Sequence, residues 1–371
     1  MEKFAFIIHP ITARDVARKY PIAKLFPDRL IESVIKGRNP EVVAKVSGIR
    51  SATGAEAEGW FIGCPYTPRL FMSEPLEAVY DKLEKCGHIA EELGAGILGL
   101  GAFTSVVGDG GITLAKRLKI AVTTGNSYTV ATAIEGAITG AKMMGISLGS
   151  ATVAVIGATG SIGATCAEIL SRSAANVNLI GRNTEKLEVI KARLAATASS
   201  NLAVFTDVGE GLRDADIIIT VSSAAEAIVL PKHIKRGAVV CDVARPRDVS
   251  VAVQKERDDV LVIEGGVVRV PGEMVSRKVP SGEPFSFGFP QGTAYACMSE
   301  TIALSLEGRY ENFTLGKDVT VAQVDEINAI CSRHGFHLDG FRSFEKAVTA
   351  EEIDHIRVRA GRGEAVTAAA V

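Results

Sequence analysis

From Thr152 to Glu264 the chain alternates between short apolar runs and longer connecting segments. The apolar runs lie near residues 153, 178, 203, 217, 239 and 261. Uninterrupted apolar runs of this length are typical of strands that are buried on both faces, and right-handed crossovers join such strands in parallel. The pattern therefore predicts an α/β fold whose centre is a Rossmann-type doubly wound parallel sheet.

Roughly the first 125 residues follow a different pattern, which predicts a separate, smaller α/β substrate lobe. A strand is expected at 4–8, a hairpin that pairs 42–50 with 56–62 around Gly54, and a long helix over 74–93. Short strands at 97–100 and 120–123 end in the polar loops 101–105 and 124–127, and a helix over 128–144 follows. Loops at strand ends often face a substrate.

After Gly265-Gly266 the pattern breaks into a passage rich in proline and glycine, 270–290, and two helices follow at 293–306 and 321–334. We expect these helices to pack against the first lobe. The expected organisation is a substrate-binding lobe at 1–126, a cofactor-binding domain at 127–290, returning helices at 291–340 and an extension at 341–371. The end of that extension, 359–371, is rich in alanine and glycine and is expected to be frayed.

Composition narrows the class of protein without identifying it. The chain has 371 residues, of which 47% are hydrophobic and 23% charged, and its net charge is −2. This length is sufficient for two domains, and this charge gives no general attraction to nucleic acid. The apolar run at 4–8 is far too short for a signal segment or a membrane span. We therefore expect a cytoplasmic protein without an integral membrane segment.

The strand at 153–156 leads into three glycines spaced three residues apart, Gly157, Gly160 and Gly163, and then into a helix. A strand, a glycine-rich turn and a helix together form the usual binding unit for the pyrophosphate of a dinucleotide, because the backbone N–H groups at the helix start meet the anion. The spacing is GxxGxxG rather than the commoner GxGxxG, so the motif depends on this context. The expected cofactor-binding residues are Gly157, Thr159, Gly160, Ser161, Ile162, Gly163, Arg182, Ser222 and Gly265.

Arg182 follows the second strand of this unit at the place where NAD-binding folds usually carry an acidic residue. A guanidinium there suits the 2′-phosphate of NADPH, which it can bind through two charge-assisted hydrogen bonds. The alternative is a solvated arginine at a helix start. Lys186, one helical turn later, either supports the same preference or faces water.

The six cysteines contain no CxxC pair, and the six histidines show no metal-ligand spacing, so neither a disulfide framework nor a metal site is expected. Cys297 lies near the start of a helix whose cap could be Thr293. The helix dipole favours a thiolate at such a position. On this observation alone, a packed core cysteine remains the usual alternative.

The chain resembles two families. A lobe, a cofactor sheet and a return helix are also the plan of shikimate-type dehydrogenases, but those enzymes use a lysine and an aspartate where this chain has the loop 103–107 without lysine and Tyr128. A closer resemblance, over nearly residues 4 to 338, is to the cyanobacterial long-chain acyl-[acyl-carrier-protein] reductases. Its segments are 51–54, 101–105, 123–126, 151–163, 265–268, 296–297 and 333–336.

The second resemblance implies reduction of a fatty acyl thioester to an aldehyde, with Cys297 as the nucleophile that takes the acyl group and NADPH as the hydride donor. It implies an acyl carrier protein or a CoA thioester as acyl donor, and an enzyme that consumes the aldehyde as a further partner. Two other functions stay open: an NADP-dependent shikimate- or quinate-type dehydrogenase, and a protein that binds NADPH or an acyl carrier without turnover.

The oxyanion formed during such a reaction needs hydrogen-bond donors. Ser105 and Asn126 are the expected catalytic donors, and Thr104 and Ser127 are further candidates that turn or cap roles explain equally well. His88 is a weak candidate for a proton donor, and the role of Glu300, three residues after Cys297, stays open. A basic patch for an acidic carrier is expected either at Arg14, Arg18 and Lys19 or at Lys116, Arg117 and Lys119. The passage 270–290 departs from the reductase pattern, so it puts the identity of the acyl donor in doubt.

Overall fold

The computed structural model describes residues 1–18, 20–224 and 226–362, which divide into two compact units. Unit 1 comprises Met1–Tyr128, Val268–Val319 and Glu326–His337, and unit 2 comprises Thr129–Val267, Thr320–Asp325 and Leu338–Val371. The passage after residue 267, expected in the cofactor domain, therefore belongs to unit 1. The reason is that β13 (Gly272–Lys278) pairs antiparallel with β2 (Glu41–Arg50).

Unit 2 is built on a six-stranded parallel sheet, which confirms the predicted fold class. Its strands follow the order β11-β10-β9-β6-β7-β8. The chain adds strands outward from β6 to β8 on one side and from β9 to β11 on the other, so the order reverses between β6 and β9. All six predicted strands are present: β6 (Thr152–Ile156), β7 (Asn176–Ile180), β8 (Asn201–Phe205), β9 (Ile217–Thr220), β10 (Val239–Asp242) and β11 (Leu261–Glu264).

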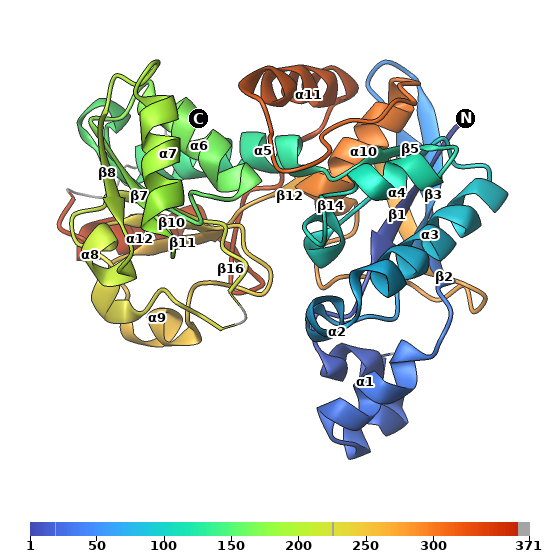
Figure 1. Cartoon of the computed structure of the whole chain (residues 1–371). Helices are drawn as coiled ribbons and strands as arrows, with labels where there is room; N and C mark the ends of the chain where they lie inside the picture. Colours follow the sequence, from blue (N-terminus) through green and yellow to red (C-terminus); the bar gives the residue numbers. More distant parts are fainter. Residues whose placement is uncertain (19, 225, 363–371) are drawn as a thin grey trace. The chain divides into compact units, whose positions relative to one another are not determined.

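Helices cover both faces of this sheet because most of its strand positions are apolar, on both faces. Ile156, Ile218 and Val240 belong to a buried cluster shared with α8 (Val208–Leu212) and α9 (Val251–Glu256). On the opposite face the thiol of Cys241 donates to the carbonyl of Ala133 in α5 (Asn126–Met143), at 3.7 Å. Figure 1 shows α8 and α9 on one side of the strands and α5 and α6 on the other. The crossover helices are α6 (Ser161–Ser171) and α7 (Thr184–Leu194).

The C-terminal extension is ordered over most of its length. A hairpin of β16 (Phe341–Ser343) and β17 (Lys346–Val348) precedes α12 (Ala350–Arg359), and β16 lies against β11. The helix thus reaches the start of the tail that was expected to be frayed, and residues 363–371 of that tail lie outside the described residues.

Unit 1 contains a second six-stranded sheet, with the order β13-β2-β3-β1-β4-β5. The hairpin of β2 and β3 (Glu56–Gly63) turns at Gly54, whose φ of +89° confirms the predicted need for glycine. β1 (Glu2–Ile8) runs parallel to β3 and β4 (Ile97–Gly99), and β4 runs parallel to β5 (Ala121–Thr123). The carboxyl ends of β1, β4 and β5 therefore meet at one edge of the sheet.

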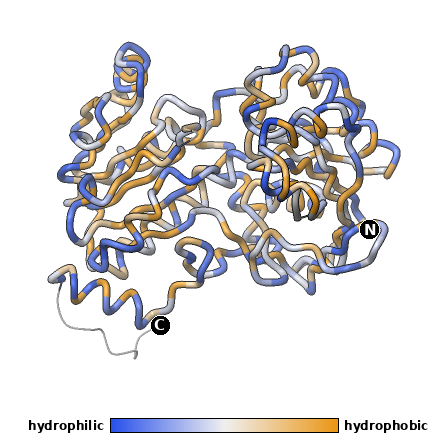
Figure 2. The backbone as a smooth tube through the Cα atoms, turned by 90° about the horizontal axis from the view of Figure 1, so that it is seen from below, coloured by the Kyte–Doolittle hydropathy of each residue, from blue (hydrophilic) through white to orange (hydrophobic). Residues whose placement is uncertain are grey.

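Two helical layers enclose this sheet. Leu83 and Cys86 of α3 (Leu76–Glu92) pack with Ala5 and Leu98 on one face. On the other face α10 (Ala296–Leu306) approaches so closely that a Cβ on Gly99 would lie 2.1 Å from Oγ1 of Thr301. Figure 2 shows hydrophobic stretches, in orange, recurring along the chain in both units. The remaining helices of unit 1 are α1 (Asp28–Lys36), α2 (Pro68–Ser73), α4 (Ile112–Arg117) and α11 (Val321–His334), which begins in unit 2.

Short elements complete the fold. A small sheet in the order β14-β12-β15 joins β14 (Thr293–Tyr295), β12 (Val267–Arg269) and β15 (His337–Leu338), and the 3₁₀ helices are η1 (Ala13–Arg18), η2 (Pro21–Leu25), η3 (Ala102–Ser105), η4 (Leu148–Ser150) and η5 (Pro231–His233). Among the described residues, no helix combines the length and the apolar character that crossing a bilayer requires.

Candidate active site

The glycine turn of unit 2 has the geometry of a dinucleotide cradle. Gly157 directly follows β6 and has a φ of +82°, and a Cβ there would lie 2.9 Å from the carbonyl oxygen of Val221. A Cβ on Gly163 would lie 2.3 Å from the carbonyl oxygen of Gly157, so α6 can approach the turn only because residue 163 has no side chain. Gly160 is the N-cap of α6 and is exposed. Gly157 thus fits the tight turn, Gly160 the approach of a phosphate and Gly163 the close packing of α6, which are the roles of the three glycines in a pyrophosphate-binding turn.

The start of α6 offers the polar groups for an anion. The first hydrogen bond of the helix runs from the amide of Ala164 to the carbonyl of Gly160, at 2.9 Å, and the N-cap contributes no side-chain hydrogen bond. The amides that precede this bond in the first turn point out of the N-terminal end of the helix. Their dipoles point toward the turn, which fits a phosphate group there.

Arg182 lies close to this turn, two residues after the end of the neighbouring strand β7. A Cβ on the preceding Gly181 would lie 3.7 Å from Cγ2 of Thr159 in the glycine turn. The Arg182 side chain is exposed, and no ion pair involves it among the described residues. Asn183, not Arg182, caps α7 by accepting from the amide of Lys186 at 2.8 Å. The guanidinium is therefore available to an anion at the end of β7.

Ser222 and Gly265 have structural duties close to the turn. The Ser222 hydroxyl donates to Oδ1 of Asp248 at 2.6 Å, and its amide donates to Oδ2 at 2.9 Å. A Cβ on Gly265 would lie 2.7 Å from Cγ2 of Val243, so this glycine permits close packing. Neither contact excludes cofactor binding, but the Ser222 hydroxyl hydrogen is already committed to a carboxylate.

The sequence analysis missed two buried carboxylates, Asp242 and Asp248, which support this part of unit 2. Asp242 accepts from the amides of Ala244 and Val249, at 3.1 and 3.0 Å. Burial raises its pKa to about 6, and the hydrogen bond from Val249 opposes that rise. The available signal was an acidic residue at the end of an apolar strand, Asp242, with a second one, Asp248, in the loop that follows. Together they fix the loop after β10, on the same edge of the sheet as the glycine turn.

Cys297 lies in unit 1 and differs from the other five cysteines. It is partly exposed, whereas Cys64, Cys86, Cys166, Cys241 and Cys331 are buried. Burial raises the pKa of the Cys166 thiol to about 12 and raises that of Cys331 well above its usual value. Because the thiolate is the nucleophile, these buried cysteines are poor candidates for catalysis.

The helix that carries Cys297 begins later than predicted. Residues 293–295 form β14, and α10 starts at Ala296, so Cys297 is its second residue. The expected cap, Thr293, instead donates its hydroxyl to the carbonyl of Pro290 at 2.7 Å, and the N-cap Tyr295 makes no side-chain capping bond. The prediction of Thr293 as cap is therefore wrong, because a short strand pairing takes up that residue. The later start places Cys297 closer to the positive end of the helix dipole.

The turn after β5 lies directly against Cys297. A Cβ on Gly125 would lie 2.3 Å from Cα and 2.4 Å from Cβ of Cys297, and Gly125 has a φ of +72°. Only glycine fits both the space and the backbone conformation. Asn126, the first residue of α5, is 4% exposed. The structure thus brings Cys297 and the Gly125-Asn126 turn together.

Glu300 fastens this turn to α10. It is fully buried, and its carboxylate accepts from the hydroxyls of Thr123 and Ser127, at 2.5 and 2.7 Å, and from the amide of Tyr128 at 2.9 Å. Burial raises the pKa of Glu300, and these hydrogen bonds oppose the rise. The sequence left open whether the Glu300 carboxylate opposes a thiolate at Cys297. In the structure its oxygens accept hydrogen bonds from the turn after β5.

The predicted oxyanion donors are not equivalent. Ser105 donates to the carbonyl of Ala102 at 2.7 Å, Thr104 donates to that of Gly101 at 2.8 Å, and Ser127 donates to Glu300. Their hydroxyl hydrogens are therefore already used within the protein. Asn126 carries two side-chain N–H groups, and it lies next to the residue that contacts Cys297.

His9 is a further residue at this edge that the sequence analysis did not select. It follows β1, and its Nε2 accepts from the amide of Phe103 at 3.2 Å. The ring proton is therefore on Nδ1, which donates to the carbonyl of Pro10 at 3.0 Å. Burial lowers the pKa of His9 to about 4, so the ring is neutral at pH 7. His88, by contrast, is half exposed on α3 beside Glu84 and Glu91, as expected for a surface residue.

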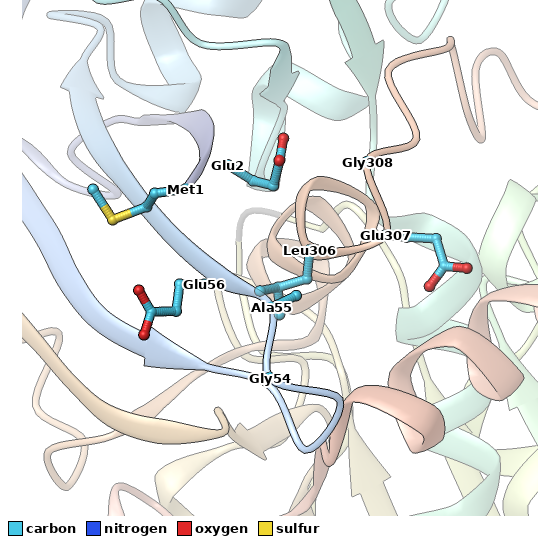
Figure 3. A pocket seen from close by; sticks show the side chains of 8 residues that line it. All are labelled: Met1, Glu2, Gly54, Ala55, Glu56, Leu306, Glu307 and Gly308. Carbon is cyan, nitrogen blue, oxygen red and sulfur yellow. The ribbon is translucent and has the colours of Figure 1, made fainter.

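The pocket in Figure 3 lies elsewhere on unit 1. It has a volume of about 410 Å³, and Glu2, Glu56 and Glu307 are among its lining residues. Leu306, at the C-terminal end of α10, also lines it, so it is roughly 14 Å along the helix from Cys297. Its carboxylates disfavour an anionic acyl donor. We therefore do not assign substrate binding to this pocket.

Three comparisons place the chain among known proteins. The family model described as shikimate / quinate 5-dehydrogenase matches residues 139–264, which all belong to unit 2. The aminotransferase PigE of Serratia sp. is 27% identical over 96% of this chain, which spans 42% of PigE. The long-chain acyl-[acyl-carrier-protein] reductase of Synechococcus elongatus is 28% identical over 87% of this chain and 94% of that protein. A dipicolinate synthase polypeptide of Bacillus halodurans is 14% identical over 71% of this chain and 90% of its own, with a TM-score of 0.34.

The family-model match and the likeness to the reductase confirm the resemblance that the sequence indicated. The dehydrogenase match is confined to the cofactor-binding unit, so it carries no information about the reactive groups of unit 1. The likeness to the reductase extends over both units. With the glycine turn, they indicate an NAD(P)-dependent oxidoreductase.

The neutral state of His9 predicts a specific pH dependence of stability. The pKa of His9 is about 4 in the folded chain and about 6.5 when unfolded. Below pH 6.5 the unfolded chain binds a proton that the folded chain does not bind, so stability falls as the pH decreases toward 4. Between pH 7 and 4.5 we expect the free energy of unfolding of the wild type to fall about 2–3 kcal/mol more than that of His9→Gln. Urea unfolding measures both; a parallel fall would contradict the neutral assignment.

Proposed function

We propose that the chain is an NADPH-dependent reductase of fatty acyl thioesters that releases an aldehyde, with Cys297 as the nucleophile. One observation carries the proposal: Cys297, partly exposed while the other five cysteines are buried, is the second residue of α10 and contacts Gly125 at the carboxyl edge of β1, β4 and β5. The likeness to the acyl-carrier-protein reductase over both units supports the substrate class.

The reaction begins with acyl transfer to the protein. The Cys297 thiolate attacks the carbonyl carbon of the thioester, and the carbon–sulfur bond to the donor breaks. The donor leaves as a thiolate that takes up a proton, and the acyl group is then bound to Cys297. The start of α10 favours the charge on sulfur in the free protein, and it lies close to the oxygen that becomes negative in the addition.

The second step is reduction of the acyl group on Cys297. NADPH, when bound, would supply the hydride that adds to the carbonyl carbon. The Asn126 side chain and the backbone amides of the first turn of α10 stabilise the resulting oxyanion. When the oxygen reforms the carbonyl, the bond to Cys297 breaks, the aldehyde leaves and the thiolate is restored. Gly125 is essential, because any side chain there would overlap Cys297.

Arg182 is the basis for proposing NADPH over NADH. Its exposed guanidinium lies at the end of β7, beside the turn that receives the pyrophosphate, where the ribose of a dinucleotide is bound in folds of this type. A guanidinium binds a 2′-phosphate through two parallel hydrogen bonds. The uncharged ribose hydroxyl of NADH gains little from the same guanidinium.

The acyl donor is proposed as a carrier protein or a CoA thioester, and an aldehyde-consuming enzyme as a further partner. One of the two expected basic patches is weakened by the structure. Arg117 pairs with Glu77, Asp81 and Glu84, at 2.5, 3.3 and 3.2 Å, so its charge is balanced locally. Lys116 and Lys119 alone offer little attraction to an acidic carrier.

A polyol dehydrogenase is the second candidate, favoured by the family model that matches residues 139–264. That activity needs a base near the substrate hydroxyl. The loop at 103–107 contains no lysine, and Tyr128 stands where the dehydrogenases carry aspartate. Tyr128 is also buried, with its amide bound to Glu300. A binding protein without turnover is the third candidate.

Replacement of the nucleophile separates the three candidates. We expect Cys297→Ala to lower the rate of aldehyde release from a long-chain acyl-CoA with NADPH by at least about a thousandfold, because acyl transfer loses its acceptor. Cys86→Ala is the matched control, since Cys86 is a buried cysteine on α3 of the same unit, and it should retain activity. Aldehyde release that survives Cys297→Ala would contradict covalent catalysis. Oxidation of shikimate or quinate by both variants would identify a dehydrogenase, and an inactive wild type would leave only binding.

Removal of the guanidinium tests the cofactor preference. We expect Arg182→Ala to raise the KM for NADPH about 10- to 100-fold, because a charge-assisted hydrogen bond contributes about 1.5–3 kcal/mol. The KM for NADH should change little. Arg172→Ala is the control, since Arg172 pairs with Glu168 at the far end of α6. Equal effects of Arg182→Ala on the two cofactors would rule out recognition of the 2′-phosphate.

A further inference from the structure

The helical segment between β1 and β2 has one face in the core and one in solvent. Ala23, Ile31 and Ile35 belong to the buried cluster of unit 1. In Figure 1, α1 lies at the end of unit 1 beyond α2. The outward face carries large apolar side chains, which we name the apolar tip, and their exposed fractions are large: Ile22 66%, Leu25 79%, Phe26 41%, Leu30 47% and Val34 57%.

This concentration is unusual within the chain. Sixteen large apolar residues are exposed among the described residues, and five of them fall within residues 22–34. Single exposed apolar side chains are ordinary, but a contiguous group marks a contact surface. On α1, Leu30 and Val34 are one helical turn apart, so they form one apolar edge that flanks the buried Ile31 and Ile35.

The same segment is basic in a chain of net charge −2. Residues 13–38 contain seven lysines and arginines and three acidic residues. The acidic side chains are engaged: Asp28 pairs with Arg14 at 3.0 Å, Asp15 accepts from the amide of Thr12 at 2.8 Å, and Glu32 is buried. Lys24 and Arg29 are exposed, and neither forms an ion pair with another described residue.

An apolar edge flanked by lysine and arginine is complementary to an anionic lipid surface. The aliphatic side chains enter the boundary between headgroups and acyl chains, and the cations lie at the phosphates. A protein partner is less suited, because the tip is mainly aliphatic rather than aromatic, and protein interfaces are depleted in lysine. The tip consists of isoleucine, leucine, valine and one phenylalanine, on short turns that project from the unit.

We infer that the apolar tip docks the protein on an anionic membrane surface, with Ile22, Leu25 and Phe26 inserted into the interface and Lys24 and Arg29 at the headgroups. This is peripheral attachment and is independent of the proposed reaction. It would hold unit 1 where long acyl chains and their aldehydes partition.

The test is co-sedimentation of the full chain with vesicles of phosphatidylcholine containing about 30% phosphatidylglycerol, against vesicles of phosphatidylcholine alone. We expect binding to the anionic vesicles that weakens as salt is added, because salt screens the charge attraction. Ile22→Ser with Leu25→Ser should lower the partition constant at least about tenfold, since each loses most of a buried side chain on binding. Lys24→Gln with Arg29→Gln should weaken binding at low salt only.

The matched control is Val189→Ser on α7, which removes an apolar side chain that is 67% exposed in unit 2, and it should bind as the wild type does. Circular dichroism checks that all variants are folded. Failure of the wild type to bind the anionic vesicles, or equal binding by the Ile22/Leu25 variant, would overturn the inference. A dimer of the wild type that dissociates when Ile22 and Leu25 are replaced would also overturn it. So would binding of an acidic carrier protein that requires the apolar tip, if the protein does not bind vesicles.

Discussion

The candidate active site depends on one buried carboxylate, that of Glu300. A buried carboxyl group is tolerated only when donors satisfy it, and here three donors come from a single turn, at Thr123, Ser127 and Tyr128. The hydrogen bonds hold that turn against α10, so Gly125 contacts Cys297 and Asn126 lies next to that contact. Loss of the carboxylate would leave three buried donors without an acceptor, which costs more than the bonds themselves contribute. The position of the thiol is therefore fixed by packing and polar contacts together.

The two units divide the chemistry. Unit 2 holds the glycine turn and the start of α6, whose geometry fits the pyrophosphate of a dinucleotide, and Arg182, which is proposed to bind a 2′-phosphate. Unit 1 holds Cys297, Asn126 and the neutral His9, which lie at the ends of parallel strands or on the helix packed over them. The family match to dehydrogenases stops within unit 2, whereas the likeness to the reductase continues through unit 1. The reactive groups, rather than the cofactor fold, therefore distinguish the proposed function from its rivals.

Much of the fold could be predicted because its signals are local. The six apolar runs after Thr152, the glycine turn and the hairpin at Gly54 each occupy a few neighbouring residues. The pairing of β13 with β2 could not be predicted, since it joins residues more than two hundred positions apart and moves the passage after 267 into unit 1. The role of Glu300 was left open for the same reason, because its partners are on another element. The cap at Thr293 was mispredicted because a strand pairing overrides a local helix signal.

The most direct test of this account is intact-mass analysis of the protein after incubation with hexadecanoyl-CoA and no NADPH. The account predicts a mass increase of one acyl group, located at Cys297 by peptide mapping, which disappears on addition of NADPH as an equal amount of aldehyde is released. A protein that stays unmodified and nevertheless releases aldehyde at the normal rate once NADPH is added would contradict it.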